Sequence, residues 1–205
     1  MAVFVPASRV ARWVANFSEG HGGAELSVDD GRLSGLAQDG STFRAALPFG
    51  AAYDGAPDAD AFAGALDVPA GWGVLLVRKG GFAVARLEGE RIAESKVGQR
   101  HVQGRTKAGG QSQQRFARRR DNQARQAYEA AAGHAVRILA GLDPTAALVV
   151  GGDRPAVEAV LEDPRLRAIA DRVVDPWLPV PDPRRGVLEA AVRDACSAQF
   201  DVHNA

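Results

Sequence analysis

The order of the predicted elements indicates an α/β fold with a mixed sheet. Three β-prone segments lie between residues 72 and 95, a long helical stretch follows to residue 140, and one more short apolar segment precedes further helices. Strands and helices in this order generally form one sheet with helices packed on it. With 205 residues and 46% hydrophobic content, the chain is long enough for one full core and a smaller appended subdomain.

The clearest strands flank a glycine pair. Residues 72–77 and 82–87 are apolar and β-prone, and Arg78-Lys79-Gly80-Gly81 lies between them. Because glycine readily takes a positive φ, this sequence predicts a tight β-hairpin. After another turn at Glu88-Gly89-Glu90, residues 91–95 predict a third antiparallel strand.

A basic loop and a long helix come next. Residues 96–111 are polar, glycine-rich and basic, which predicts a surface loop. From 112 to 140, apolar residues recur at i+3 and i+4 and predict one helix of roughly 40 Å. The sequence beyond it predicts a strand over 146–150, helical segments from the N-cap Asp153 to Val173, a proline-rich loop over 175–185 and a last helix over 186–198.

The first 67 residues predict a small N-terminal α+β extension, and residues 68–205 predict the main domain. Apolar residues at helical spacing between Val10 and Phe17 indicate a helix, which the following glycines end. Two strands are predicted over 24–28 and 42–48. Residues 53–60, rich in Gly, Pro, Ala and Asp, predict a linker.

The charge is strongly segregated, although the formal net charge is zero. Residues 96–126 contain nine Lys or Arg and a single carboxylate, Asp121, so this segment has a charge of +8 and the remainder −8. Such a local positive field attracts phosphate backbones, whereas an acidic remainder limits indiscriminate binding to RNA. The alternative interpretation is a solvated, charged helix face.

A specific motif lies at the junction of loop and helix. Residues 107–120 read KAGGQSQQRFARRR, which contains GGQS, two variable residues, RFAR and a further arginine. This passage resembles the catalytic loop and following helix of the eukaryotic and archaeal class I translation release factors. The resemblance extends from about Trp72 to the last helix and implies an RNase-H-like domain, a mixed sheet flanked by helices.

The resemblance also sets limits. The stop-codon-reading domain and the domain that binds a GTPase have no counterpart in this chain, so stop-codon termination is not expected. The chain is more similar to the Vms-type release factors, which free nascent chains from tRNA on stalled, split large subunits. The implied activity is that of a peptidyl-tRNA hydrolase, and the implied partners are the large ribosomal subunit, with its 23S rRNA, and peptidyl-tRNA.

The resemblance assigns roles to individual residues. Gly109 and Gly110 allow the backbone to approach RNA closely, and Gln111 orients the attacking water. Gln113 is the second catalytic candidate, because Vms-type factors follow a looser G-x-x-Q pattern. The basic neighbours that would anchor the loop on phosphates are Arg100, Arg105, Lys107, Arg115, Arg118, Arg119 and Arg120.

Other classes of function fit less well. The single cysteine, Cys196, and the absence of a Cys/His cluster indicate a protein with no metal and no cofactor. No signal peptide or membrane span is recognisable, which predicts a cytoplasmic protein, expected to be a monomer. Two alternatives stay open: a nuclease that cuts the 3′ end of tRNA, and a non-catalytic ribosome- or tRNA-binding protein.

Overall fold

The computed structural model describes residues 2–99 and 111–205, with the backbone alone for Gln99 and residues 111–124. The elements are β1 (Ala2–Val5), α1 (Ala7–Gly20), β2 (Ala24–Asp29), β3 (Arg32–Ala37), β4 (Thr42–Ala46), η1 (Pro48–Gly50), α2 (Ala59–Gly64), β5 (Gly71–Arg78), β6 (Gly81–Glu88), β7 (Arg91–Gln99), α3 (Gln111–Leu139), β8 (Leu148–Gly152), α4 (Arg154–Leu161), η2 (Pro164–Leu166), α5 (Arg167–Ala170), β9 (Val173–Leu178), α6 (Arg185–Ala195) and β10 (Ala198–His203). None of the described helices is long and apolar enough to cross a bilayer.

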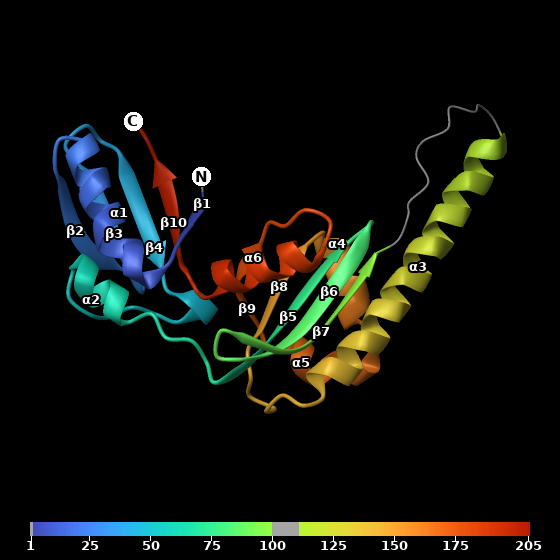
Figure 1. Cartoon of the computed structure of the whole chain (residues 1–205). Coiled ribbons are helices and arrows are strands. Elements are labelled where there is room, and N and C mark those ends of the chain that lie inside the picture. The colour runs from blue at the N-terminus through green and yellow to red at the C-terminus, as the bar shows by residue number, and fades with distance from the viewer. Residues whose placement is uncertain (1, 100–110) are drawn as a thin grey trace. The chain divides into compact units, whose positions relative to one another are not determined.

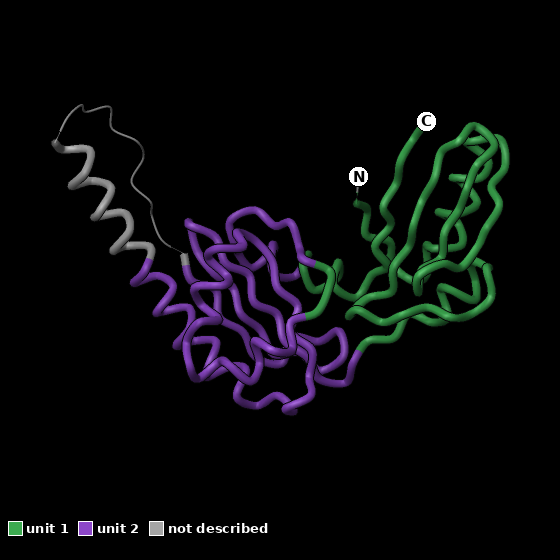
Figure 2. Tube along the Cα trace, turned by 180° about the vertical axis from the view of Figure 1, so that it is seen from behind, with its two compact units in different colours: residues 1–68, 174–176, 190–205 green, residues 69–173, 177–189 purple. Residues whose placement is uncertain are grey.

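The chain forms two compact units (Figure 2). Each unit has its own five-stranded sheet. Unit 1 comprises Met1–Val68, Val174–Pro176 and Ala190–Ala205, and unit 2 comprises Pro69–Val173 and Trp177–Glu189. The chain is therefore α/β with two sheets, each packed against helices.

Unit 1 is an antiparallel sheet with the strand order β1-β10-β4-β3-β2. Helix α1 packs its apolar stripe on the sheet and buries Val10, Val14 and Phe17. Aromatic rings fill the core, with the Trp13 and Phe200 ring centroids 4.2 Å apart. The predicted helix and the strands over 24–28 and 42–48 are confirmed, with small shifts at their ends.

The predicted linker over 53–60 is wrong. Tyr53 is buried, and its hydroxyl donates a 2.6 Å hydrogen bond to the carbonyl of Ala56. Helix α2 then begins at Ala59, because the Asp58 side chain accepts hydrogen bonds from the backbone N–H groups of Asp60 and Ala61. The small and acidic residues of this segment form a tight turn and a capped helix that pack on unit 1.

Unit 2 contains a mixed sheet with the strand order β7-β6-β5-β8-β9 (Figure 1). The predicted hairpin is confirmed: β5 and β6 are antiparallel and joined by Lys79-Gly80, with Arg78 opposite Gly81. Strand β7 extends the antiparallel part, and β8 pairs parallel to β5. Strands β5, β7 and β8 therefore all end at one edge of the sheet, which we call the carboxyl edge.

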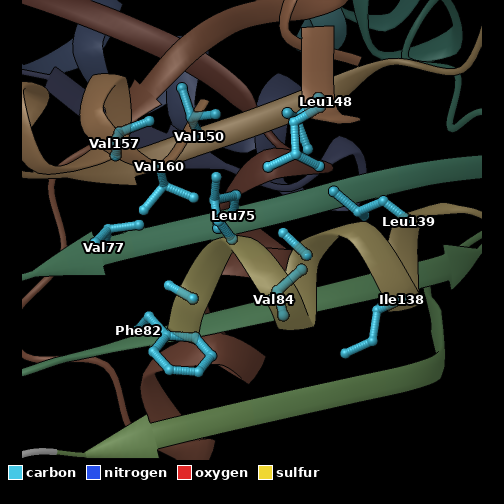
Figure 3. Packing of buried hydrophobic residues seen from close by; sticks show 14 of the residues in the cluster. Leu75, Val77, Phe82, Val84, Ile138, Leu139, Leu148, Val150, Val157 and Val160 are labelled. Atoms are coloured by element: carbon cyan, nitrogen blue, oxygen red, sulfur yellow. The ribbon is translucent and has the colours of Figure 1, made fainter. Parts of the chain in front are cut away.

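Helices cover both faces of this sheet. Leu75, Val84 and Val150 point to one face, where they form a core with α3, α4 and Leu166 (Figure 3). On the opposite face, Arg185 at the start of α6 donates a 3.1 Å hydrogen bond from Nη1 to Oγ of Ser95. The residues of β5 are buried on both faces, as expected for a strand in the centre of a covered sheet.

Several predictions in unit 2 need correction. Gly80 does not have a positive φ, and a Cβ atom there would lie 2.6 Å from Oδ2 of the exposed Asp182 side chain. The third strand continues to Gln99 and α3 begins at Gln111, so both ends of the predicted loop over 96–111 belong to these elements. Part of the predicted proline-rich loop is β9, which includes Pro176. The last helix ends at Ala195, and the residues after it form β10.

The end of the chain departs most from the expected organisation. Residues 68–205 were expected to form one domain, but β10 lies between β1 and β4 in the sheet of unit 1. Phe200 is fully buried there and packs against Phe43. Unit 1 is thus assembled from both ends of the sequence, and it is larger than a simple N-terminal extension.

Candidate active site

The candidate catalytic loop connects the carboxyl end of β7 to the start of α3. Gln99 pairs with Gly81, so the loop leaves the sheet at its carboxyl edge, next to the β5–β6 hairpin. The predicted site residues Gly109, Gly110, Arg100, Arg105 and Lys107 lie outside the described residues. The first turns of α3, whose backbone alone is described, contain Gln111, Gln113, Arg115, Arg118, Arg119 and Arg120.

The C-terminal half of α3 fixes this helix on unit 2. Ala131, Ala135 and Ile138 are fully buried against the sheet, and Tyr128 packs at the margin of the same core. The i+3 and i+4 spacing of these residues places them on one stripe, and alanine allows close approach to β6. Of the 29 residues in α3, those from Tyr128 to Leu139 therefore anchor the helix.

The direction of α3 relates its start to the loop. Leu139 lies near the beginning of β5, since a Cβ atom on Gly73 would be 2.9 Å from its Cδ2 atom. Burial raises the pKa of the Tyr128 hydroxyl, and the nearby carboxylate of Asp153 raises it further. Because Asp153 follows β8, Tyr128 lies near the opposite, carboxyl edge of the sheet. The helix therefore runs antiparallel to β5, and its N-terminal direction leads past the carboxyl edge.

A ring stack supports the root of the loop. The imidazole of His134 on α3 stacks on Phe82 of β6, with centroids 5.6 Å apart and planes 26° apart. Phe82 in turn lies against Gly98 of β7, where a Cβ atom would be 2.3 Å from Cε1 of the ring. The backbone of β7 just before the loop is thus packed against the same ring that positions α3.

An ion pair joins the two segments that flank the loop. Nη1 of Arg137 on α3 lies 2.7 Å from Oε1 of Glu94 on β7. Both side chains are exposed, so this pair contributes at most about 1 kcal/mol to stability. Its importance is geometric, because it ties the helix to the strand on which the loop begins.

The surroundings of His134 favour its neutral form. Burial is the main cause of a lowered pKa for this imidazole, and the positive charges of Lys96 and Arg137 lower the pKa further. Protonation would put a third positive charge beside these two groups in a partly buried place. The packing of α3 on β6 therefore favours the neutral ring.

The sequence predicts the loop but not the side chains that support it. Gly98 lies inside a predicted loop, and only its location in a strand shows that a close ring contact requires a glycine. A glycine within a strand pattern can indicate such an approach, but that pattern was not recognised beyond Ser95. Among the residues that the structure describes, no three His, Cys, Asp or Glu side chains form a group suited to a metal ion.

Comparison with protein families decides the relationship. The family model described as Actinobacteria/chloroflexi VLRF1 release factor matches residues 70–201, which is more than half of the chain. The chain belongs to this family. The VLRF1 match begins just before β5 and continues into β10, so it includes the sheet of unit 2, the loop and α3. None of the curated proteins matches the chain. Membership in the VLRF1 family establishes a release-factor relationship and implies binding to the ribosome.

Proposed function

We propose that this chain is a Vms-type peptidyl-tRNA hydrolase that acts on stalled or split large subunits without a stop codon. Gln111 is the catalytic residue in this proposal. The observation that carries it is the GGQS-x-x-RFAR-x-R signature at the junction of loop and α3, in a chain of the VLRF1 release-factor family. The basic segment around this signature suits a site that enters a cavity made of RNA.

The start of α3 at Gln111 supports the catalytic role. The first backbone N–H groups of a helix have no acceptor within the helix, and the helix dipole places partial positive charge at this end. The N–H of Gln111 is therefore available to a water molecule or to a developing oxyanion. Gly109 and Gly110 precede it without side chains, so RNA can approach the backbone closely.

The reaction is ester hydrolysis. The water oxygen forms a bond to the carbonyl carbon of the peptidyl ester, and the bond from that carbon to the 3′ oxygen of the terminal ribose breaks. The departing ribose oxygen gains a proton, and the peptide leaves as a carboxylic acid. Gln111 contributes by orienting the water through its side chain and by stabilising the oxyanion through its backbone N–H. A neutral amide suits this role because it does not titrate near neutral pH.

The fold of unit 2 fits the proposed relationship. Three antiparallel strands, β5 to β7, are followed by the long helix α3 and by β8, which is parallel to β5. Helices lie on both faces of this sheet. We therefore interpret unit 2 as RNase-H-like, the fold that the resemblance to class I release factors implies. Fold alone does not imply activity, so the signature remains the basis of the proposal.

A release assay tests the function. Purified protein is added to large-subunit and intact-ribosome complexes that hold peptidyl-tRNA, and free peptide is measured over time. We expect the Gln111→Ala variant to lose at least about a hundredfold in rate, since one oriented donor in a hydrolytic site is worth that much. Its affinity for the ribosome should be unchanged. Release by this variant at the normal rate would reject the assignment.

Gln113→Ala is the matched control, because Gln113 is the competing catalytic candidate in the same segment. We expect it to release peptide at nearly the normal rate. The tRNA product distinguishes the alternatives: an intact CCA end indicates ester hydrolysis, and a shortened end indicates a nuclease. A protein that binds ribosomes but leaves peptidyl-tRNA unchanged would be a binding protein only.

A further inference from the structure

A second set of side chains lies on the carboxyl edge of the unit 2 sheet, where the loop also leaves it. Strand β5 ends there at Arg78, β8 at Gly152 and β9 at Leu178, whose carbonyl lies close to Gly151. The turn into α4 is held against β5 by a 2.9 Å hydrogen bond from the N–H of Asp153 to the carbonyl of Val77. These residues come from distant parts of the sequence, so no sequence motif reveals them.

Both carboxylates at this edge face one arginine. Nη2 of Arg78 lies 3.5 Å from Oδ1 of Asp153, and its Nε lies 3.7 Å from Oδ1 of Asp182. Nη1 of the same side chain donates to the carbonyl of Val180 at 2.8 Å. Arg78 thereby offsets the negative charge of the edge and joins three segments. The neighbouring cations Lys79 and Arg154 are left without an acidic partner among the residues that the structure describes.

Arg154 lies over an aromatic ring instead of pairing with an acid. Its guanidinium carbon is 4.2 Å from the ring centroid of Trp177, although Glu158 is one helical turn away. The indole is held in place, because its Nε1 donates a 3.0 Å hydrogen bond to the carbonyl of Gly152 and its ring packs on the core. The Arg154 side chain is exposed. A cation is thus held over a fixed ring while its side chain stays exposed to solvent.

We propose that the Arg154–Trp177 stack is an RNA-binding site that takes an unpaired nucleotide. The base stacks on the outer face of the guanidinium, and the positive charges of Arg154 and Lys79 attract the adjoining phosphates. Unstacked bases commonly stack on arginine guanidinium groups and aromatic rings. Binding of phosphates needs only positive charge, so the tryptophan beneath Arg154 favours a base as ligand. The inference rests on the proposed function, which supplies the RNA partner, and it adds a contact at the same carboxyl edge, on the β8–β9 side of the sheet.

RNA binding by charge-altered variants tests the site. A labelled single-stranded RNA is titrated with the full-length protein, carrying Gln111→Ala in every case, at several salt concentrations. We expect Arg154→Glu to weaken binding by about a hundredfold and Arg154→Lys, which keeps the charge but loses the plane, by about fivefold. Arg172→Glu makes the same charge change at the opposite edge, before β9, and should change affinity by no more than about twofold.

Each outcome decides the proposal. It is overturned if Arg154→Glu weakens binding no more than Arg172→Glu does, or if Arg154→Lys binds as tightly as the parent, since charge alone would then suffice. Equal thermal midpoints of the variants ensure that folding is not the cause. Because release is measured separately, normal release by Gln111→Ala would reject the catalytic assignment and leave this site standing. Unchanged RNA binding by Arg154→Glu would reject this RNA-binding site and leave the catalytic assignment of Gln111 standing.

Photo-crosslinking distinguishes the two sources of the nucleotide. A photoreactive residue replaces Lys79, which is exposed in the hairpin turn, and the protein is bound to large subunits that hold peptidyl-tRNA. A crosslink to ribosomal RNA or to tRNA supports the site and identifies its ligand. A crosslink only to ribosomal protein would overturn it.

Discussion

Gly98 shows how a single residue controls the position of the loop. Its missing side chain leaves room for the Phe82 ring, and the same ring stacks with His134 of α3. Two glycines near the root of the loop differ in the space around them. Gly98 is enclosed by the ring, whereas a Cβ atom on Gly133 of α3 would meet no described atom within 4 Å outside its own helix backbone. Substitution by alanine should therefore have opposite effects at the two positions.

We expect Gly98→Ala to lower the free energy of unfolding by about 1–3 kcal/mol, because the added methyl group must displace a packed ring. It should also slow peptide release, although Gln111 is intact. The matched variant Gly133→Ala should raise the free energy of unfolding by up to about 1 kcal/mol, since alanine favours a helix and has room there. Urea unfolding and the release assay measure both effects. Equal effects of the two variants would contradict the claim that the Phe82 ring requires a glycine at position 98.

The lowered pKa of His134 makes the stability of unit 2 depend on pH. In the unfolded chain this imidazole binds a proton at a higher pH than in the folded chain, so acid favours the unfolded state. Stability should be full above the ordinary histidine pKa of about 6.5 and decline as the pH falls below it. Urea unfolding between about pH 5 and pH 8 should show this decline, and His134→Gln should reduce it. An identical pH profile for the variant would refute the assignment.

The sequence predicts the secondary structure best where one strong pattern covers a whole element. The β5–β6 hairpin and α3 were recognised because their apolar periodicity is continuous and their ends are marked by turn residues. Strand β3 was missed because Gly35 and Ala37 interrupt its apolar face; Gly35 has no side chain where the ring of Phe43 lies. Strand β9 was missed because Pro176 and nearby prolines indicate a loop.

The arginines in the first half of α3 precede the residues that anchor this helix in the described part of the chain, Tyr128 to Leu139. If they contact phosphates as proposed, they should set the salt dependence of ribosome binding rather than the stability of the fold. Replacing Arg118, Arg119 and Arg120 together by Gln should weaken binding and reduce the slope of log affinity against log salt by roughly 2–3. Filter binding at several salt concentrations measures that slope.

The control removes the same charge elsewhere. Arg9, Arg12 and Arg193 are exposed residues of unit 1, and their joint replacement by Gln should leave the slope nearly unchanged. If both triple variants reduce the slope equally, net charge and not the first half of α3 determines binding.

The site itself was predictable only as a motif, since its supports come from β6, β7 and α3 and meet only in the folded chain.

The division of charge follows the division into units. Unit 1 contains five Lys or Arg and twelve Asp or Glu, a net charge of −7, and unit 2 contains twenty and thirteen, a net charge of +7. The sequence showed that a basic segment exists within an acidic remainder. It did not show that residues 190–205 belong with the acidic N-terminal part, because β10 has polar residues on one face and pairs with strands distant in sequence.

The two units have separate cores with no residue in common, so a defect in one should leave the other folded. Phe200 of β10 is fully buried, and Phe200→Ala should cost about 3–5 kcal/mol of unit 1 stability. Hydrogen exchange should show lost protection in β1 to β4 and normal protection in β5 to β8. Asp201→Ala, on the adjacent residue and the other face of the strand, should have little effect. Loss of protection in both units would contradict separate folding.

The position of β10 between β1 and β4 also affects how the two units form during translation. During translation, every strand of unit 2 leaves the ribosome before the one that lies between β1 and β4. Domains generally fold as they emerge, so unit 2 can be complete while the other sheet is still divided into two parts. A translation product that stops short of residue 198 would combine a finished unit 2 with exposed strand edges in unit 1, a form open to aggregation and to proteolysis.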